Sequence, residues 1–376
     1  MTQTGKSRMI AAMKGEVSDR VPVAPDISNM IPAKLTGKPF WDVYLYQDPP
    51  LWQAYLQARQ RYGFDGWLPL YHNYGVIEAV GEDTMIVERN AERIVTRRYA
   101  ANTHGQRRWA DYVGVYPACE TPTMKHVETV GLRIEATPGW YEPVDLCRLP
   151  PEKSLVELYH EVSPLMGDDG VVGLSVGIPG LGGPEDIYRW ADEPDAMREE
   201  AHVKTEKAVQ EAERICRLRP DFLFIGYSGI LVWNTLQSLR ELCLPALAQV
   251  TAVARRHGIP SQMHCCGPSR KVVEICAERT DLCSINPLER PPLGDCDMAE
   301  IKRLYGQKIS LMGNVPTVDL MLFGTPADVE RDAKWLIDVC APGGGFILST
   351  GDQCGRDTPE ENLRALIETA ENYGRY

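Results

Sequence analysis

The sequence predicts an α/β fold in which eight parallel strands close into a (β/α)8 TIM barrel, with an antiparallel β segment inserted after the second strand. Two observations lead to this fold. Apolar, β-rich runs recur along the 376 residues, and stretches with helical periodicity lie between them. The segment from about residue 80 to 140 breaks this alternation and shows a two-residue period instead. We therefore expect one barrel domain, residues 1–376, with a β insertion at about 80–140.

Eight runs are predicted to be strands because they are short, apolar and bounded by turn residues. In chain order they are VPVAPDIS (21–28), FDGWLPLYH (64–72), VVGLSVGI (171–178), DFLFIGYS (221–228), IPSQMHC (259–265), DLCSIN (281–286), KISLMGNV (308–315) and GGFILST (344–350). Continuous apolar runs are typical of parallel strands that are buried on both faces. An open doubly wound sheet is the alternative arrangement.

The predicted helices repeat apolar residues at the spacing of a helical turn. They are SLVELYHEVSPLM (154–166), PDAMREEAHVKTEKAVQEAERICRL (194–218), LPALAQVTAVARRHG (244–258), DMAEIKRLYG (297–306) and TPADVERDAKWLIDVC (325–340). The last begins with Thr325, Pro326 and Asp328, which suit an N-cap, the first helical position and an acidic first turn. For the insertion at 80–140, a long irregular loop is the alternative to antiparallel strands.

Composition and charge exclude several classes of protein. The net charge of −12 repels nucleic-acid backbones, and no basic segment offsets it. No apolar run approaches the roughly 18 residues that a membrane-spanning helix needs, and the first residues do not resemble a signal peptide. An odd count of 11 cysteines without such a signal favours reduced thiols and a cytoplasmic location.

A metal site is predicted where the fifth strand ends, in the sequence MHCCG. Alternate residues of a strand share a face, so His264 and Cys266 point together and Cys265 points away. Cys354, just after the eighth strand, is the candidate third ligand, because strand ends of a barrel meet at one rim. Two thiolates and an imidazole with one open position form a catalytic zinc set. The alternative is that these cysteines are ordinary small core residues.

Other polar and aromatic residues fall at the same rim. Glu289 follows the sixth strand and is the candidate fourth donor to the metal. We assign catalytic roles to Glu289, Tyr227 and Asn314, and substrate-binding roles to Asp26, Tyr71, His72 and Trp233. The aromatic members suit an aromatic substrate ring, although core packing or loop capping explains each of these residues equally well.

The carboxyl-terminal half resembles the uroporphyrinogen decarboxylase superfamily. The resemblance is carried by MHCCG, LMGNVPTVDLMLFGTPADV, GGFILSTGDQCG and TPEENLRALIETAENYG, and near the amino end by GEVSDRVPVAP. It implies a (β/α)8 barrel. The decarboxylases carry an arginine-rich tetrapyrrole-binding stretch near the amino end, whereas the equivalent DRVPVAPDISNMIPAKL has a single arginine, Arg20.

The His-x-Cys pair with a late cysteine resembles the corrinoid-dependent methyltransferase branch. That resemblance implies a Zn2+ enzyme with His264, Cys266 and Cys354 as ligands. It also implies cobalamin supplied by a separate corrinoid protein, since the chain has no Asp-x-His-x-x-Gly corrinoid-binding motif. We expect methyl transfer from a small methylated donor, a methoxylated aromatic in the first place, to cob(I)alamin. The alternatives are a methylcobalamin:thiol (coenzyme M type) methyltransferase and a uroporphyrinogen-type decarboxylase.

Overall fold

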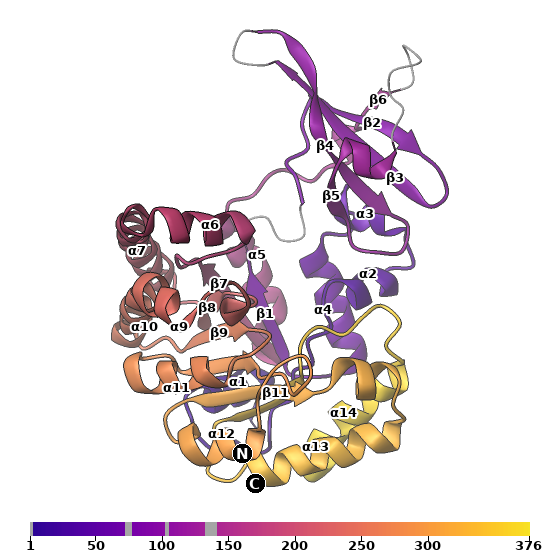
Figure 1. The fold of residues 1–376 in the computed structure, drawn as a ribbon. Coiled ribbons are helices and arrows are strands. Elements are labelled where there is room, and N and C mark those ends of the chain that lie inside the picture. Colours follow the sequence, from indigo (N-terminus) through magenta and orange to yellow (C-terminus); the bar gives the residue numbers. More distant parts are fainter. Residues whose placement is uncertain (1–2, 72–76, 102–104, 132–140) are drawn as a thin grey trace. The chain divides into compact units, whose positions relative to one another are not determined.

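The computed structural model describes residues 3–71, 77–101, 105–131 and 141–376 (Figure 1). The chain divides into two compact units. Unit 1 comprises Met1–Asp26, Tyr62–Tyr71 and Ser154–Tyr376, and unit 2 comprises Ile27–Arg61 and His72–Lys153. That residues 1–376 form a single domain stays a prediction.

Unit 1 is an α/β structure built on a seven-stranded parallel sheet. The sheet order is β1–β7–β8–β9–β10–β11–β12, so consecutive strands of this unit are neighbours. The strands are β1 (Gly66–Leu70), β7 (Gly170–Val176), β8 (Phe222–Gly226), β9 (Ser261–Cys265), β10 (Ser284–Pro287), β11 (Ser310–Val315) and β12 (Phe346–Thr350). Each coincides to within one residue at either end with part of a run that the sequence predicts to be a strand, and nearly every residue in these strands is buried. The parallel α/β architecture is confirmed.

The first predicted strand, 21–28, is reduced to one bridge. Val23 pairs with Leu348 of β12 in parallel, and its carbonyl accepts the amide of Asp65, which directly precedes β1. The segment therefore hydrogen-bonds toward both edge strands of the seven-stranded sheet. It does not extend into a ladder because Pro22 and Pro25 flank this pairing and have no N–H to donate.

Helices alternate with these strands along the chain. Those of unit 1 are α1 (Gly5–Met13), α5 (Leu155–Met166), α6 (Pro184–Asp192), α7 (Pro194–Arg217), α8 (Ile230–Trp233), α9 (Leu236–Ser238), α10 (Leu244–His257), α11 (Arg270–Arg279), α12 (Met298–Tyr305), α13 (Pro326–Cys340) and α14 (Glu360–Tyr373). α7 packs beside α10, and α13 beside α14 (Figure 1). The predicted start of α13 is confirmed, since the Thr325 side chain accepts the Asp328 amide and Pro326 is the first helical residue.

An ion-pair network lies beneath the amino ends of the strands. Asp65, 3% exposed, accepts hydrogen bonds from Arg8, Arg20 and the backbone amide of Val23. Arg8 also binds Asp19, with 2.8 Å between Nε and Oδ1. Since Asp65 directly precedes β1, this network fixes the amino end of that strand to α1 and to the bridging segment around Val23.

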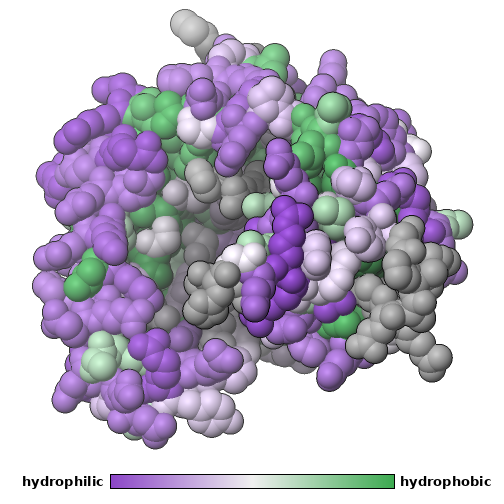
Figure 2. All heavy atoms as spheres, turned by 90° about the horizontal axis from the view of Figure 1, so that it is seen from above, coloured by the Kyte–Doolittle hydropathy of each residue, from purple (hydrophilic) through white to green (hydrophobic). Residues whose placement is uncertain are grey.

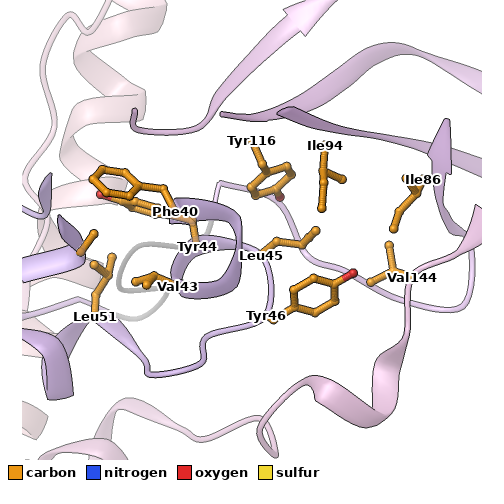
Figure 3. Close-up of a cluster of buried hydrophobic side chains, with 11 residues drawn as sticks. Phe40, Val43, Tyr44, Leu45, Tyr46, Leu51, Ile86, Ile94, Tyr116 and Val144 are labelled. Atoms are coloured by element: carbon orange, nitrogen blue, oxygen red, sulfur yellow. The ribbon is translucent and has the colours of Figure 1, made fainter. Parts of the chain in front are cut away.

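Unit 2 contains the predicted antiparallel strands. Its sheet order is β5–β4–β3–β2–β6, formed by β2 (Thr84–Arg89), β3 (Arg93–Ala101), β4 (Arg107–Pro117), β5 (Thr123–His126) and β6 (Glu142–Pro143). Its helices are α2 (Met30–Leu35), α3 (Phe40–Tyr44) and α4 (Leu51–Tyr62), the last ending in unit 1. In Figure 3, Phe40, Tyr44 and Leu45 belong to the same buried apolar cluster as Ile94 and Tyr116 of the sheet. Burial of this cluster gives unit 2 its own core.

Most atoms on the face drawn in Figure 2 belong to hydrophilic residues, with hydrophobic residues in smaller patches. Among the helices of the described residues, none combines the length and the apolar composition that crossing a membrane requires.

Candidate metal centre

Three side chains with metal-binding atoms meet at the carboxyl ends of the parallel strands. His264 lies near the end of β9, Cys266 directly follows that strand, and Asp352 lies two residues beyond β12. One ligand atom from each lies within 4.8 Å of the other two. Among the described residues, a search for three or more histidine, cysteine or acidic side chains close enough to share an ion finds this one group.

His264 provides an imidazole. Its side chain is nearly buried, and burial lowers its pKa, an effect that the nearby Asp352 carboxylate partly opposes. Nε2 lies 4.0 Å from Asp352 Oδ1, while Nδ1 lies 3.4 Å from Nδ2 of Asn286 on the adjacent strand β10. Because an unprotonated ring nitrogen is the form that binds a metal, the lowered pKa favours metal binding.

The two adjacent cysteines have different surroundings. Burial, and then the Asp352 carboxylate, raise the pKa of the Cys266 thiol, while hydrogen bonds from Gly229 and Ser228 oppose that rise. Cys265 is fully buried, and its pKa is raised by burial and next by Cys276 of α11. Cys265 therefore lies toward the layer between sheet and helices, as the alternation of side chains along a strand predicts.

Asp352 is a residue that sequence reasoning missed. Its φ of 131° is one that residues with a Cβ rarely adopt, and such conformations concentrate at functional sites. The turn is held by the Thr350 hydroxyl, which donates to the Asp352 carbonyl, and by the Gln353 amide, which donates to the Asp352 carboxylate at 2.8 Å. The one feature of the sequence that could have indicated Asp352 as a site residue is its position in STGDQCG, directly after the eighth predicted strand.

Cys354 lies in the same loop but is not part of the group of three. It is fully buried, and its amide donates to the carbonyl of Asp26 at 2.8 Å. Burial raises the pKa of its thiol to about 12, and the nearby carboxylates of Asp26 and Asp352 act in the same direction. Its proposed role as a metal ligand stays a prediction.

Glu289 lies beside this group. Its carboxylate accepts the amide of Gly267, the residue that follows Cys266, and the side chain is 7% exposed. Burial raises its pKa, and the charge of Asp352 adds to the rise. Glu289 therefore stabilises the turn after Cys266, and it lies near enough to Asp352 for that carboxylate to raise its pKa.

Two of the residues assigned catalytic roles make contacts within loops. The Asn314 amide donates to the Leu288 carbonyl at 2.5 Å and accepts from Nε of the Arg290 side chain at 3.0 Å, so it binds the backbone before Glu289 and the side chain after it. The Tyr227 hydroxyl donates to the Leu181 carbonyl at 3.1 Å and accepts from Asn234. A Cβ at Gly180 would lie 1.8 Å from that hydroxyl, so a larger residue there would force the Tyr227 side chain to move. Catalytic roles for Asn314 and Tyr227 stay predictions.

The residues assigned to the substrate are placed as follows. Tyr71, directly after β1, is 40% exposed, and its ring meets the ring of Phe224 edge-on at 5.7 Å. Asp26 lies close enough to Cys354 to raise the pKa of that thiol. Trp233 ends α8 and is partly buried. His72 lies outside the described residues.

The donor set fits zinc. Thiolate, imidazole and carboxylate are the zinc-binding side chains of proteins, and a three-ligand set leaves one position for a substrate. Burial raises the pKa of Cys266, Cys354 and Glu289. A bound cation would reverse these shifts, because it stabilises the deprotonated forms.

Comparison with known proteins finds similarity over the part of the chain that holds this site. The model of the uroporphyrinogen decarboxylase (URO-D) family matches residues 235–373. Uroporphyrinogen decarboxylase of Aromatoleum aromaticum is 25% identical over 205 residues, which cover 52% of this chain and 54% of that protein. Methylated-thiol–coenzyme M methyltransferase of Methanosarcina mazei is 25% identical over 191 residues, 50% of this chain and 48% of that protein.

A third relative, the methylcobamide:CoM methyltransferase MtbA of Methanosarcina mazei, is 27% identical over 135 residues, which cover 35% of this chain and 36% of that protein. The chain thus spans about half the length, or less, of the curated relatives it matches. A solved structure, a methyltransferase from Methanosarcina mazei, covers 99% of both chains with a TM-score of 0.64 and 18% identity, and shows the likeness of fold. Residues 235–373 are thus similar to the uroporphyrinogen decarboxylase family, and the relatives similar to this chain include a decarboxylase and two coenzyme M methyltransferases.

Proposed function

We propose that the protein is a zinc-dependent methyltransferase that moves a methyl group from a methoxylated aromatic donor to the cob(I)alamin of a separate corrinoid protein. The observation that carries this proposal is the grouping of His264, Cys266 and Asp352 within 4.8 Å at the carboxyl ends of the strands. Parallel α/β enzymes keep their reactive groups at this end of the sheet.

In this proposal His264 and Cys266 hold the metal from one strand end and a residue of the β12 loop completes the set. Asp352 is in position to be that residue, and Cys354 is two residues further along. Bound zinc would supply a Lewis acid for the oxygen of the methyl ether. Ser228 and the Gly229 amide stabilise the thiolate of Cys266, and Glu289 holds the following turn through Gly267. Glu289 thereby orients Cys266 as a ligand, or its own carboxylate binds the metal.

The reaction balances without a further co-reactant. Cobalt(I) supplies the electron pair of the new Co–C bond, and the electron pair of the broken C–O bond leaves with the phenolate, which then takes a proton. The names of two relatives, a methylcobamide:CoM and a methylated-thiol–coenzyme M methyltransferase, support corrinoid-linked methyl transfer.

An aromatic donor is supported by the ring of Tyr71 at the carboxyl end of β1. It is exposed on one side and packs edge-on against Phe224 on the other, a geometry that presents a ring to an incoming aromatic group. Transfer of the methyl group from methylcobalamin to a thiol is the second candidate, and the printed names of the same two relatives favour it. The ligand set serves either direction, because zinc also binds thiolates.

Decarboxylation of a tetrapyrrole is a third candidate, favoured by the name of the Aromatoleum relative. The placement of Arg20 weighs against it. Arg20 binds Asp65 at 2.9 Å at the amino ends of the strands, whereas the metal group lies at their carboxyl ends. This arginine therefore forms an ion pair with Asp65 at the opposite end of the strands from the candidate site.

The test is a substrate panel under anaerobic, reducing conditions with zinc-loaded protein and cob(I)alamin. Vanillate, veratrole and other aryl methyl ethers are compared with thiols supplied together with methylcobalamin, and the cobalt absorbance is followed. Formation of methyl-Co(III) from an ether supports the first candidate. Demethylation of methylcobalamin by a thiol, with every ether inactive, would transfer the assignment to the second.

A further inference from the structure

A buried hydrogen-bond acceptor lies beside the candidate ligand His264. Asn286 occupies the position of β10 that pairs with His264 of β9, so their side chains share one face of the sheet. Asn286 is 2% exposed, and its Nδ2 lies 3.4 Å from Nδ1 of His264. Its Oδ1 is buried and has no hydrogen-bond partner among the residues that the structure describes. A buried acceptor without a partner is unusual and calls for an explanation.

The two nitrogens of the imidazole have different neighbours. Nε2 faces Asp352 at 4.0 Å, on the side where Cys266 and Asp352 gather, whereas Nδ1 faces Asn286. A neutral imidazole carries one proton, so Nε2 can offer a lone pair to a metal only when that proton is on Nδ1. Nδ1–H then needs an acceptor, and the Asn286 amide is the group placed next to it.

We propose that Asn286 is the positioning residue of His264: its Oδ1 accepts the Nδ1–H and thereby directs Nε2 to the metal. This inference rests on the metal site of the proposed function. A half-turn of the amide about its Cβ–Cγ bond exchanges Oδ1 and Nδ2, which occupy nearly the same volume. Without metal, Nδ2 donates to Nδ1 and the Nε2 proton faces Asp352. With metal, Oδ1 gains the partner that it otherwise lacks.

The experiment measures zinc affinity by competition with a chromophoric chelator in the wild type, in Asn286→Asp and in Asn286→Leu. Aspartate keeps an oxygen that accepts from Nδ1–H, so its affinity should stay within about threefold of the wild type or rise. Leucine has a similar size but no acceptor, and its affinity should fall roughly 10–100-fold, the range typical for loss of a group that orients a ligand. Equal affinity of Asn286→Leu and the wild type, or equal losses in both variants, would overturn the inference.

A second measurement identifies the metal-binding nitrogen in the wild type, and a spectrum of His264→Ala serves only to assign the ring signal of His264. The protein is labelled with 15N in its histidine rings and loaded with 113Cd in place of zinc. The inference predicts cadmium coupling to Nε2 and a retained proton on Nδ1 for the ring whose signal is lost in His264→Ala. Coupling through Nδ1 would overturn it while leaving the metal site intact. A wild type that binds neither metal would contradict the proposed function and the inference together.

Discussion

Nε2 of His264 lies 4.0 Å from Oδ1 of Asp352, although β10 and β11 separate the strands that carry these residues. Two side chains from strands so far apart in the sheet meet only because the sheet curls, with Val23 hydrogen-bonded toward both of its edges. The curvature of the sheet therefore brings Asp352 to His264 and Cys266. Only His264 and Cys266 are close together in the sequence.

Replacing Cys266 should remove most of the metal affinity, whereas replacing Cys265 should not. Cys266→Ala takes away one of the three donors, and we expect a loss larger than the roughly 10–100-fold typical of groups that only orient ligands. Cys265→Ala is the matched control, since this thiol is fully buried and lies toward Cys276. Metal content after dialysis against a weak chelator measures both. Similar losses in the two variants would show that the assignment of strand faces is wrong.

The third ligand is decided by comparing Asp352→Asn with Cys354→Ala. The structure places the Asp352 carboxylate with His264 and Cys266, so Asp352→Asn should weaken zinc binding more than Cys354→Ala does. X-ray absorption at the zinc edge provides an independent reading, because two sulfur ligands at about 2.3 Å differ from one. A two-sulfur signal that becomes a one-sulfur signal in Cys354→Ala would instead establish the ligand set expected from the sequence.

Glu289 should act on the metal through the turn that follows Cys266. Glutamine retains an oxygen for the Gly267 amide, so Glu289→Gln should keep zinc affinity within about threefold of the wild type. Alanine leaves that amide without its acceptor, and affinity should fall roughly 10–100-fold. If the glutamine variant loses as much affinity as the alanine variant, the charge of Glu289 matters and the carboxylate is itself a ligand.

Asp19 should make stability depend on acid pH. The Arg8 hydrogen bond holds the pKa of Asp19 at about 2 in the folded chain, against 3.8 for an ordinary aspartate. A lowered pKa adds stability that is fully present above 3.8 and is lost as pH falls toward 2. Because the pair is partly exposed, the contribution at neutral pH should be about 1–2 kcal/mol. Denaturation of the wild type and Asp19→Asn at pH 7 and at pH 2.5 measures it. A difference that does not shrink in acid would contradict this origin.

The sequence was enough to predict many of the elements, because each combines regularly spaced apolar residues with residues typical of its ends, such as Thr325 and Pro326 at α13. These elements are strands β7 to β12 and helices α5, α7, α10, α12 and α13. The first strand was predicted too long. Its apolar run, 21–28, contains Pro22 and Pro25, and these residues limit the pairing to Val23.

The candidate site was only partly predictable. Strand alternation was enough to pair His264 with Cys266, since that relation is local. Asp352 was missed because its approach to His264 depends on the curl of the sheet and on a backbone φ of 131°, and neither is visible in the composition of STGDQCG. Asn314 and Tyr227 lie at strand ends as expected, yet their polar atoms hydrogen-bond to backbone and side chains of neighbouring loops and helices, a distinction that requires coordinates.

Metal depletion and reconstitution show whether methyl transfer depends on zinc bound at this site. The protein is stripped with a chelator, titrated with zinc, and assayed at each step for methylation of cob(I)alamin by an aryl methyl ether. We expect no methyl transfer without metal and full recovery at one zinc per chain, with no recovery in Cys266→Ala. Methyl transfer at an unchanged rate in the metal-free protein would contradict this expectation.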